Sequence, residues 1–250
     1  MNLRFTSCLP KAFRGNYKIA LAFNPGANNP AMSSQSFKLK VSPSVGLVSA
    51  IYIVPDKPKC IFTLAHGAGA GMDHAFMETL ADALSKVGIA TLRFNFPFAE
   101  HKKGRPDSPA IAHLTIGAAI AKASELNPKL PLFASGKSFG GRMSSQYLAN
   151  HPDSSVKGII FYGFPLHPSG RPSTERADHL KALKIPMLFL QGAKDTLATW
   201  ALMKTVCESL RKATLVKLDG ADHSFKAGKN DVMSLLVNET KKWVEKIIKQ

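Results

Sequence analysis

The sequence predicts an α/β fold: a doubly wound, mostly parallel sheet of about eight strands with helices on both faces. Apolar segments of strand length alternate with segments of helical periodicity from residue 59 onward, as in such sheets. Several of the short segments, such as KCIFTLA at 59–65, are apolar almost throughout, which is typical of strands that helices cover on both sides. Glycine-rich turns follow some of these segments directly.

The expected elements are read from apolar periodicity and from turn residues. Two strands at 37–41 and 45–54 come first, joined by the turn Ser42-Pro43-Ser44. The strands expected after them are 59–65, 89–96, 130–134, 156–162, 186–191 and 214–218. The helices expected are 73–87, 111–126, 139–150, 176–183, 200–210 and 232–248. This order indicates one α/β domain over 35–250, with no internal repeat.

Residues 1–34 differ from the rest and are expected to form a disordered extension. The chain has no acidic residue before Asp56, and PGANNP at 25–30 is rich in residues that break regular structure. A basic, acid-poor segment of this kind is also typical of an organelle transit peptide. A third interpretation is that Met32 is the true start.

The charge, the cysteines and the apolar runs of the chain exclude several classes of protein. The formal net charge is +16 in 250 residues, yet lysine and arginine are spread along the chain without a basic block, so neither a nucleic-acid nor a membrane partner is expected. The three cysteines, Cys8, Cys60 and Cys207, form no C-x-x-C pair. No disulfide framework, metal site or cofactor is expected. The chain has no apolar run of about 18 residues, so we expect a soluble, cytoplasmic protein.

The segment Gly136-Lys137-Ser138-Phe139-Gly140 fits the nucleophile-elbow pattern G-x-S-x-G. An apolar strand precedes it and a helical segment follows, which is the context that this motif requires. The turn holds the serine in a strained conformation that exposes its hydroxyl group. Ser138 is therefore the candidate nucleophile.

A serine hydroxyl needs a base to remove its proton and an acid to orient that base. Asp195 follows the strand at 186–191, and His223 follows the strand at 214–218. The order Ser, Asp, His at successive strand ends is that of a catalytic triad on this architecture. Asp222 and Asp219 lie in the same loop as His223 and are the alternatives for the acid.

The turn HGAGAG at 66–71 directly follows a buried strand, so its backbone N–H groups could bind a phosphate or an oxyanion. No Walker lysine follows, and the spacing is not that of a dinucleotide site. We therefore expect an oxyanion hole formed by the N–H groups of Phe139 and Ala68. His66 is expected to shape the turn through hydrogen bonds to the backbone.

Two loops, 97–109 and 163–175, leave strands at the same sheet edge as the candidate triad and should border an open site without a helical lid. They carry several basic or histidine side chains: His101, Lys102, Lys103, Arg105, His167 and Arg171. A basic border hints at an acidic substrate, so the expected partner is a small-molecule acyl substrate, with an anionic one as an option. For Lys137 and Arg142 beside the serine we expect structural roles, a turn side chain and a helix salt bridge.

The motifs AHGAGAGMDHAFM, RFNFPF, GKSFGGRM, GFPLHPSGRP, LFLQGAKD and DHSFK, together with the ordered Ser138, Asp195 and His223, resemble the α/β-hydrolase superfamily from about residue 37 onward. More narrowly, they resemble a branch of bacterial predicted hydrolases that is similar to a testis-expressed animal protein and a chromatin-complex scaffold subunit. Dienelactone hydrolases are more distantly similar and carry cysteine at the position of Ser138.

The resemblance implies an α/β-hydrolase fold without a large cap domain and an enzyme that hydrolyses esters. The expected function is therefore a serine hydrolase that acts on carboxylic esters or related acyl compounds through an acyl-enzyme. The alternative, which the animal relatives suggest, is a non-catalytic binding or scaffold module on the same fold. The complete set of Ser138, Asp195 and His223 favours the enzyme.

Overall fold

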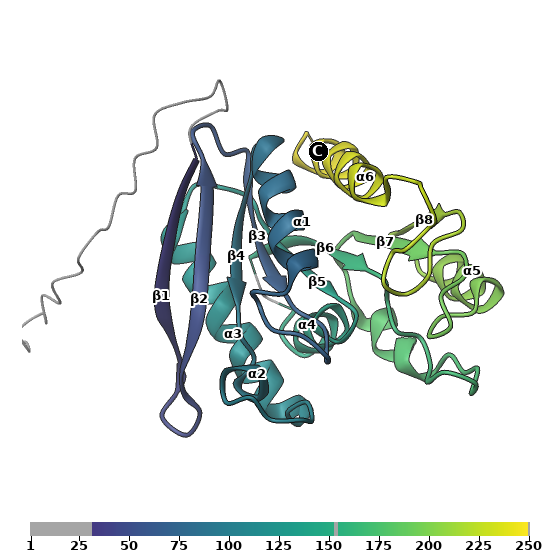
Figure 1. Cartoon of the computed structure of the whole chain (residues 1–250), viewed down its shortest axis with the longest axis horizontal. Coiled ribbons are helices and arrows are strands. Elements are labelled where there is room, and N and C mark those ends of the chain that lie inside the picture. The colour runs from purple at the N-terminus through teal and green to yellow at the C-terminus, as the bar shows by residue number, and fades with distance from the viewer. Residues whose placement is uncertain (1–31, 153–154, 250) are drawn as a thin grey trace, which may run out of the picture.

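The computed structural model describes residues 32–152 and 155–249. They form an eight-stranded sheet with the strand order β1-β2-β4-β3-β5-β6-β7-β8 (Figure 1). β2 (Gly46–Pro55) is antiparallel to both β1 (Met32–Ser42) and β4 (Ile89–Phe94). Every other pairing, from β4 across to β8, is parallel. The prediction of a doubly wound, mostly parallel sheet of about eight strands is confirmed.

Apart from the strand at one edge, the parallel strands are buried because helices cover both faces of the sheet. They are β3 (Cys60–Ala65), β4, β5 (Leu132–Lys137), β6 (Val156–Tyr162), β7 (Met187–Gly192) and β8 (Ala213–Leu218). All residues of β3, β4 and β7 are buried, which explains their almost continuous apolar sequences. β8 lies at the edge of the sheet and is only partly covered.

The helices form two layers, each with its own apolar core. α1 (Ala75–Lys86) and α6 (Val232–Ile248) pack against one face, beside each other (Figure 1). The opposite core contains residues of α3 (Pro109–Leu126), α4 (Phe139–Ala149), α5 (Trp200–Ser209) and the 3-10 helix η1 (Glu175–Ala182). In the described part of the chain, no helix is long and apolar enough to cross a membrane.

Three elements differ from the sequence prediction. β1 begins at Met32, so residues 32–34 belong to the sheet and not to the N-terminal extension; the rest of that extension, 1–31, lies outside the described residues. The loop at 97–109 begins with a short helix, α2 (Pro97–Glu100), which has proline at its first position. The segment 175–182 forms a 3-10 helix instead of an α-helix.

The corner between β5 and α4 packs directly against the end of β3. A Cβ atom on Gly140 would lie 2.4 Å from the carbonyl oxygen of Ala65 and 2.6 Å from that of His66. A Cβ atom on Gly136 would lie 2.5 Å from the backbone nitrogen of Gly141. Because the neighbouring atoms are backbone atoms, they have little room to move. The glycines of the motif therefore permit the close approach of the elbow to β3.

Replacing Gly140 with alanine should lower the free energy of unfolding by about 1–3 kcal/mol or more, because the added methyl group overpacks a rigid corner. Urea denaturation of the variant measures the change. Gly104→Ala is the matched control, since a Cβ at Gly104 meets nothing within 4 Å, and it should stay within about 0.5 kcal/mol of the wild type. Equal stability of the two variants would contradict the packing argument.

Candidate active site

Ser138 lies at the junction of β5 and α4 with backbone angles φ 50° and ψ −115°. Few residues other than glycine adopt a positive φ, and among the non-glycine residues that the structure describes only Lys102 and Phe225 share it. The conformation lifts the hydroxyl group away from the sheet. It confirms that the G-x-S-x-G segment forms the strained turn that the sequence predicts.

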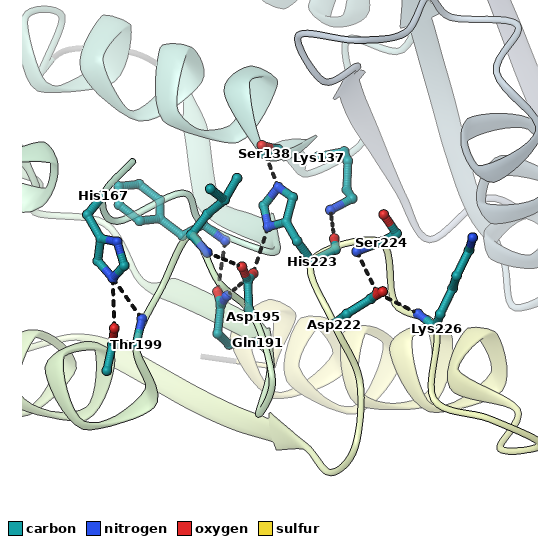
Figure 2. A network of polar contacts seen from close by, with 12 residues as sticks. Lys137, Ser138, His167, Gln191, Asp195, Thr199, Asp222, His223, Ser224 and Lys226 are labelled. Atoms are coloured by element: carbon teal, nitrogen blue, oxygen red, sulfur yellow. Dashed lines mark hydrogen bonds and ion pairs between the residues drawn. The ribbon is translucent and has the colours of Figure 1, made fainter. Parts of the chain in front are cut away.

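The structure brings Ser138, His223 and Asp195 into one hydrogen-bonded series (Figure 2). The Ser138 hydroxyl donates to Nε2 of His223, with 2.8 Å between Oγ and Nε2. On the other side of the ring, Nδ1–H donates to Oδ2 of Asp195 at 2.7 Å. The Asp195 side chain is fully buried, while that of His223 is 21% exposed. These distances place the serine proton next to a base that is itself oriented by a carboxylate.

Two further groups hold Asp195 in position. The Gln191 side chain donates from Nε2 to Oδ2 of Asp195 at 2.6 Å, and the Leu197 backbone N–H donates to Oδ1 at 2.8 Å. The Oε1 atom of Gln191 in turn accepts a hydrogen bond from the Phe164 N–H at 2.9 Å. Sequence reasoning missed Gln191, although it is a polar residue near the end of an otherwise apolar strand.

The alternative acids do not contact the histidine ring. Asp222 accepts the backbone N–H groups of Ser224 and Lys226 at 2.8 Å and 2.9 Å, so its carboxylate shapes the loop that carries His223. Asp219 forms an exposed ion pair with Lys217 at 2.8 Å. Asp195 is therefore the carboxylate that the fold places on the imidazole.

Lys137 connects the elbow to the loop of His223. Its ammonium group donates a hydrogen bond to the backbone carbonyl of His223 (Figure 2). The same group lies 4.6 Å from the centre of the Phe225 ring. A cation over an aromatic face is stabilised by the ring quadrupole. Lys137 therefore fixes the backbone of His223, which is more than the turn role expected from the sequence.

His66 shapes the glycine-rich turn, as the sequence predicts. The ring is completely buried; its Nδ1 donates to the carbonyl oxygen of Gly67 at 2.8 Å, and its Nε2 accepts the Phe96 N–H at 3.0 Å. Burial lowers the pKa of the imidazole to about 4, so the ring is neutral at pH 7. His66 thus joins the turn after β3 to the end of β4.

The HGAGAG turn lies directly beside Ser138. A Cβ on Gly67 would be 3.8 Å from Cβ of Ser138. Among the described residues, neither the Ala68 N–H nor the Phe139 N–H finds a backbone acceptor. Ala68 also lines a cleft of about 710 Å³, which extends over Asn95 and Glu100 to Lys102 and Lys103. A second hollow of about 580 Å³ lies near the opposite end of α4, at Tyr147 and Asn150.

The loops beside the site agree only in part with the predicted basic border. His101, Lys102, Lys103, Arg105 and Arg171 are exposed. His167 is not on the border: it is 2% exposed, and its Nε2 accepts the Thr199 N–H at 2.9 Å.

Arg142 makes no ion pair with any residue from 32–152 or 155–249, so the expected helix salt bridge is wrong. Within the same ranges, no cluster of three or more His, Cys, Asp or Glu is arranged to hold a metal.

Comparison with known proteins identifies the family of the chain. A family model described as an alpha/beta hydrolase domain matches residues 58–249. The chain belongs to this family. Two Mycobacterium tuberculosis proteins, each named "Putative phosphoribosyl transferase", are 26% identical over 176 residues, which is 69% of this chain. The chain spans only 38% of the length of these curated relatives.

Solved α/β-hydrolase structures share the fold of this family member. A dienelactone hydrolase from Anabaena variabilis superposes with a TM-score of 0.69 at 20% identity, covering 85% of this chain and 96% of its own. An alpha-beta serine hydrolase homologue from Coxiella burnetii gives 0.68 at 23% identity, covering 82% and 96%. A serine hydrolase without lid from Xanthomonas campestris gives 0.66 at 23%, covering 84% and 94%. The described residues likewise show no large cap.

The burial of Lys137 has a measurable consequence for stability. Burial lowers the pKa of its ammonium from 10.5 to about 8, against the opposing influence of the Asp195 and Asp222 carboxylates. Between pH 8 and 10.5 the unfolded chain therefore binds a proton that the folded chain has lost. Stability from this group should rise with pH across that window.

Wild type should gain up to about 3 kcal/mol of unfolding free energy relative to Lys137→Met as the pH rises from 7.5 to 10.5. Urea denaturation at several pH values measures the difference. Lys194→Met, at an exposed lysine near the same site, is the control and should show a constant difference. A constant difference for Lys137→Met as well would mean that Lys137 is not a buried cation.

Proposed function

We propose that this α/β-hydrolase family member is a serine hydrolase that cleaves carboxylic esters or related acyl compounds through an acyl-enzyme. The observation that carries the proposal is the hydrogen-bonded series from the Ser138 hydroxyl through His223 to the buried Asp195. The strained backbone of Ser138 supports it further, because a binding module would gain nothing from that conformation.

In the proposed reaction the Oγ of Ser138 attacks the acyl carbonyl carbon while Nε2 of His223 takes the hydroxyl proton. Asp195 accepts the Nδ1–H bond and stabilises the imidazolium that forms. His223 then gives the proton to the leaving alkoxide, and an acyl-enzyme on Ser138 remains. Water, deprotonated by His223, attacks this acyl group and releases the acid.

The negative charge on the carbonyl oxygen would be held by backbone N–H groups. Phe139 and Ala68 are the proposed donors, because both N–H groups lack a backbone acceptor among the described residues and their segments border Ser138. Each such donor contributes a few kcal/mol to stabilising the transition state. The cleft that begins at Ala68 would accommodate part of the substrate.

A fluorophosphonate probe should label the wild type at Ser138, as mapped by peptide mass spectrometry. Ser138→Ala should lose the label together with roughly three orders of magnitude or more of p-nitrophenyl acetate and butyrate turnover, since the nucleophile is absent. Circular dichroism would confirm that the variant is folded. If folded wild type neither labels nor hydrolyses esters, the non-catalytic binding module is the better description.

Asp195→Asn should reduce kcat by roughly 10³-fold or more, because an amide no longer stabilises the imidazolium. Asp222→Asn is the matched control in the neighbouring loop: its side-chain oxygen still accepts the N–H groups of Ser224 and Lys226, so kcat should stay within about ten-fold. Steady-state kinetics on p-nitrophenyl butyrate compare the two. A larger loss of kcat in Asp222→Asn than in Asp195→Asn would contradict the assignment of Asp195 as the acid.

A further inference from the structure

Four cationic or titratable side chains, here called the α4 cluster, gather on the side of α4 that faces α3 and η1. Arg142 comes from α4, His113 from α3, and Arg176 and His179 from η1. Both α3 and η1 pack against α4. The two loops that border the active site lead directly into α3 and η1, so the α4 cluster lies where these loops converge.

Arg142 is placed one helical turn after the nucleophile. Its backbone N–H donates to the carbonyl oxygen of Ser138 at 3.1 Å. The Cα–Cβ bonds of a helix tilt toward its N-terminus, which for Arg142 is the Ser138 end of α4. One turn corresponds to about 5.4 Å along the axis. The Arg142 side chain therefore begins about one turn from the residue that would hold the acyl group.

The guanidinium has no counter-ion among residues 32–152 and 155–249. Its Nε is buried and finds no hydrogen-bond partner, and neither Arg142 nor Arg176 forms an ion pair within the described residues. The acidic residues of η1 do not supply one: Glu175 is exposed, and Asp178 pairs with Lys181 at 3.4 Å. A partly buried guanidinium without an anion is unfavourable.

The two histidines of the α4 cluster carry no negative charge that could balance the arginines. Nε2 of His179 contacts Oγ of Ser145 at 2.8 Å, and burial together with the Arg142 charge lowers the pKa of this ring to about 4. Nε2 of His113 is buried without a hydrogen-bond partner. Burial also lowers the pKa of Arg142, with the neighbouring charge of Arg176 adding to the effect. Two arginines and two neutral imidazoles thus lie close enough to influence one another, without an ion pair to either arginine among the described residues.

Building on the proposed ester hydrolysis, we propose that Arg142 and Arg176 bind an anionic oxygen group of the substrate, a carboxylate or a phosphate, about one helix turn from the ester carbonyl. The planar guanidinium matches both groups, because each presents two oxygens for paired N–H donors. The substrate would then be a short half-ester of a dicarboxylic acid or its phosphonate counterpart, and the α4 cluster would select it over a neutral ester.

The test compares esters of similar acyl length: monoethyl succinate, ethyl 3-phosphonopropanoate and the neutral ethyl butyrate, each followed by pH-stat titration. Wild type should prefer one anionic ester over ethyl butyrate in kcat/KM by about ten-fold or more, the effect of a hydrogen bond to a charged group. Arg142→Gln and Arg176→Gln should each reduce this preference, mainly through KM. Which anionic ester is preferred distinguishes carboxylate from phosphate.

Arg211→Gln removes an exposed arginine of another segment and is the matched control, for which the preference should be unchanged. Wild type that hydrolyses ethyl butyrate without any preference for an anionic ester would overturn the anion site and leave the proposed hydrolysis intact. Equal loss for charged and neutral esters in Arg142→Gln would also overturn it, since that pattern indicates a structural role.

Calorimetry separates the two proposals when no ester is hydrolysed. Succinate and inorganic phosphate are titrated into Ser138→Ala and into Ser138→Ala with Arg142→Gln. Binding of either anion that the second substitution weakens by about ten-fold or more supports the anion site even if fluorophosphonate labelling fails. If neither anion binds Ser138→Ala, the anion site is wrong, whatever the outcome for catalysis.

Discussion

The close contact between the elbow and the end of β3 is the constraint on which the site depends. Gly140 approaches the carbonyl oxygens of Ala65 and His66 more closely than any side chain would allow. This contact brings the HGAGAG turn to the side of Ser138 and stabilises a serine backbone that costs of order 1–3 kcal/mol in isolation. The candidate nucleophile and the candidate oxyanion donors are thus positioned by one backbone contact.

The remaining part of the site is assembled from neighbouring strand ends. β5, β6, β7 and β8 follow one another in the sheet, so the residues after them meet at one edge. Asp195 after β7 and His223 after β8 reach Ser138 after β5 across the end of β6, where Gly163 has a φ of 74°. A Cβ on Gly163 would lie 3.1 Å from Nζ of Lys137, so the glycine leaves room for the lysine that binds the His223 carbonyl.

Much of the fold and site follows from patterns in the sequence that have a local physical cause. Buried parallel strands are apolar, and the elbow needs glycine at defined positions, so the strands and the position of Ser138 can be predicted from the sequence. Asp195 and His223 follow from strand order. The expectations for His167 and Arg142 were wrong because the burial and pairing of a polar side chain depend on residues that are distant in the sequence. The role of Gln191 and the hydrogen bond from Lys137 to the His223 carbonyl were missed for the same reason.

The Gln191 amide has a consequence for how firmly the Asp195 carboxylate is held. One end of the amide donates to that carboxylate, and the other accepts the N–H of Phe164, in the loop that leaves β6. Phe164 is completely buried in the core on one side of the sheet. The carboxylate on His223 is thereby anchored to the packed interior of the domain, and not only to the loop that carries it.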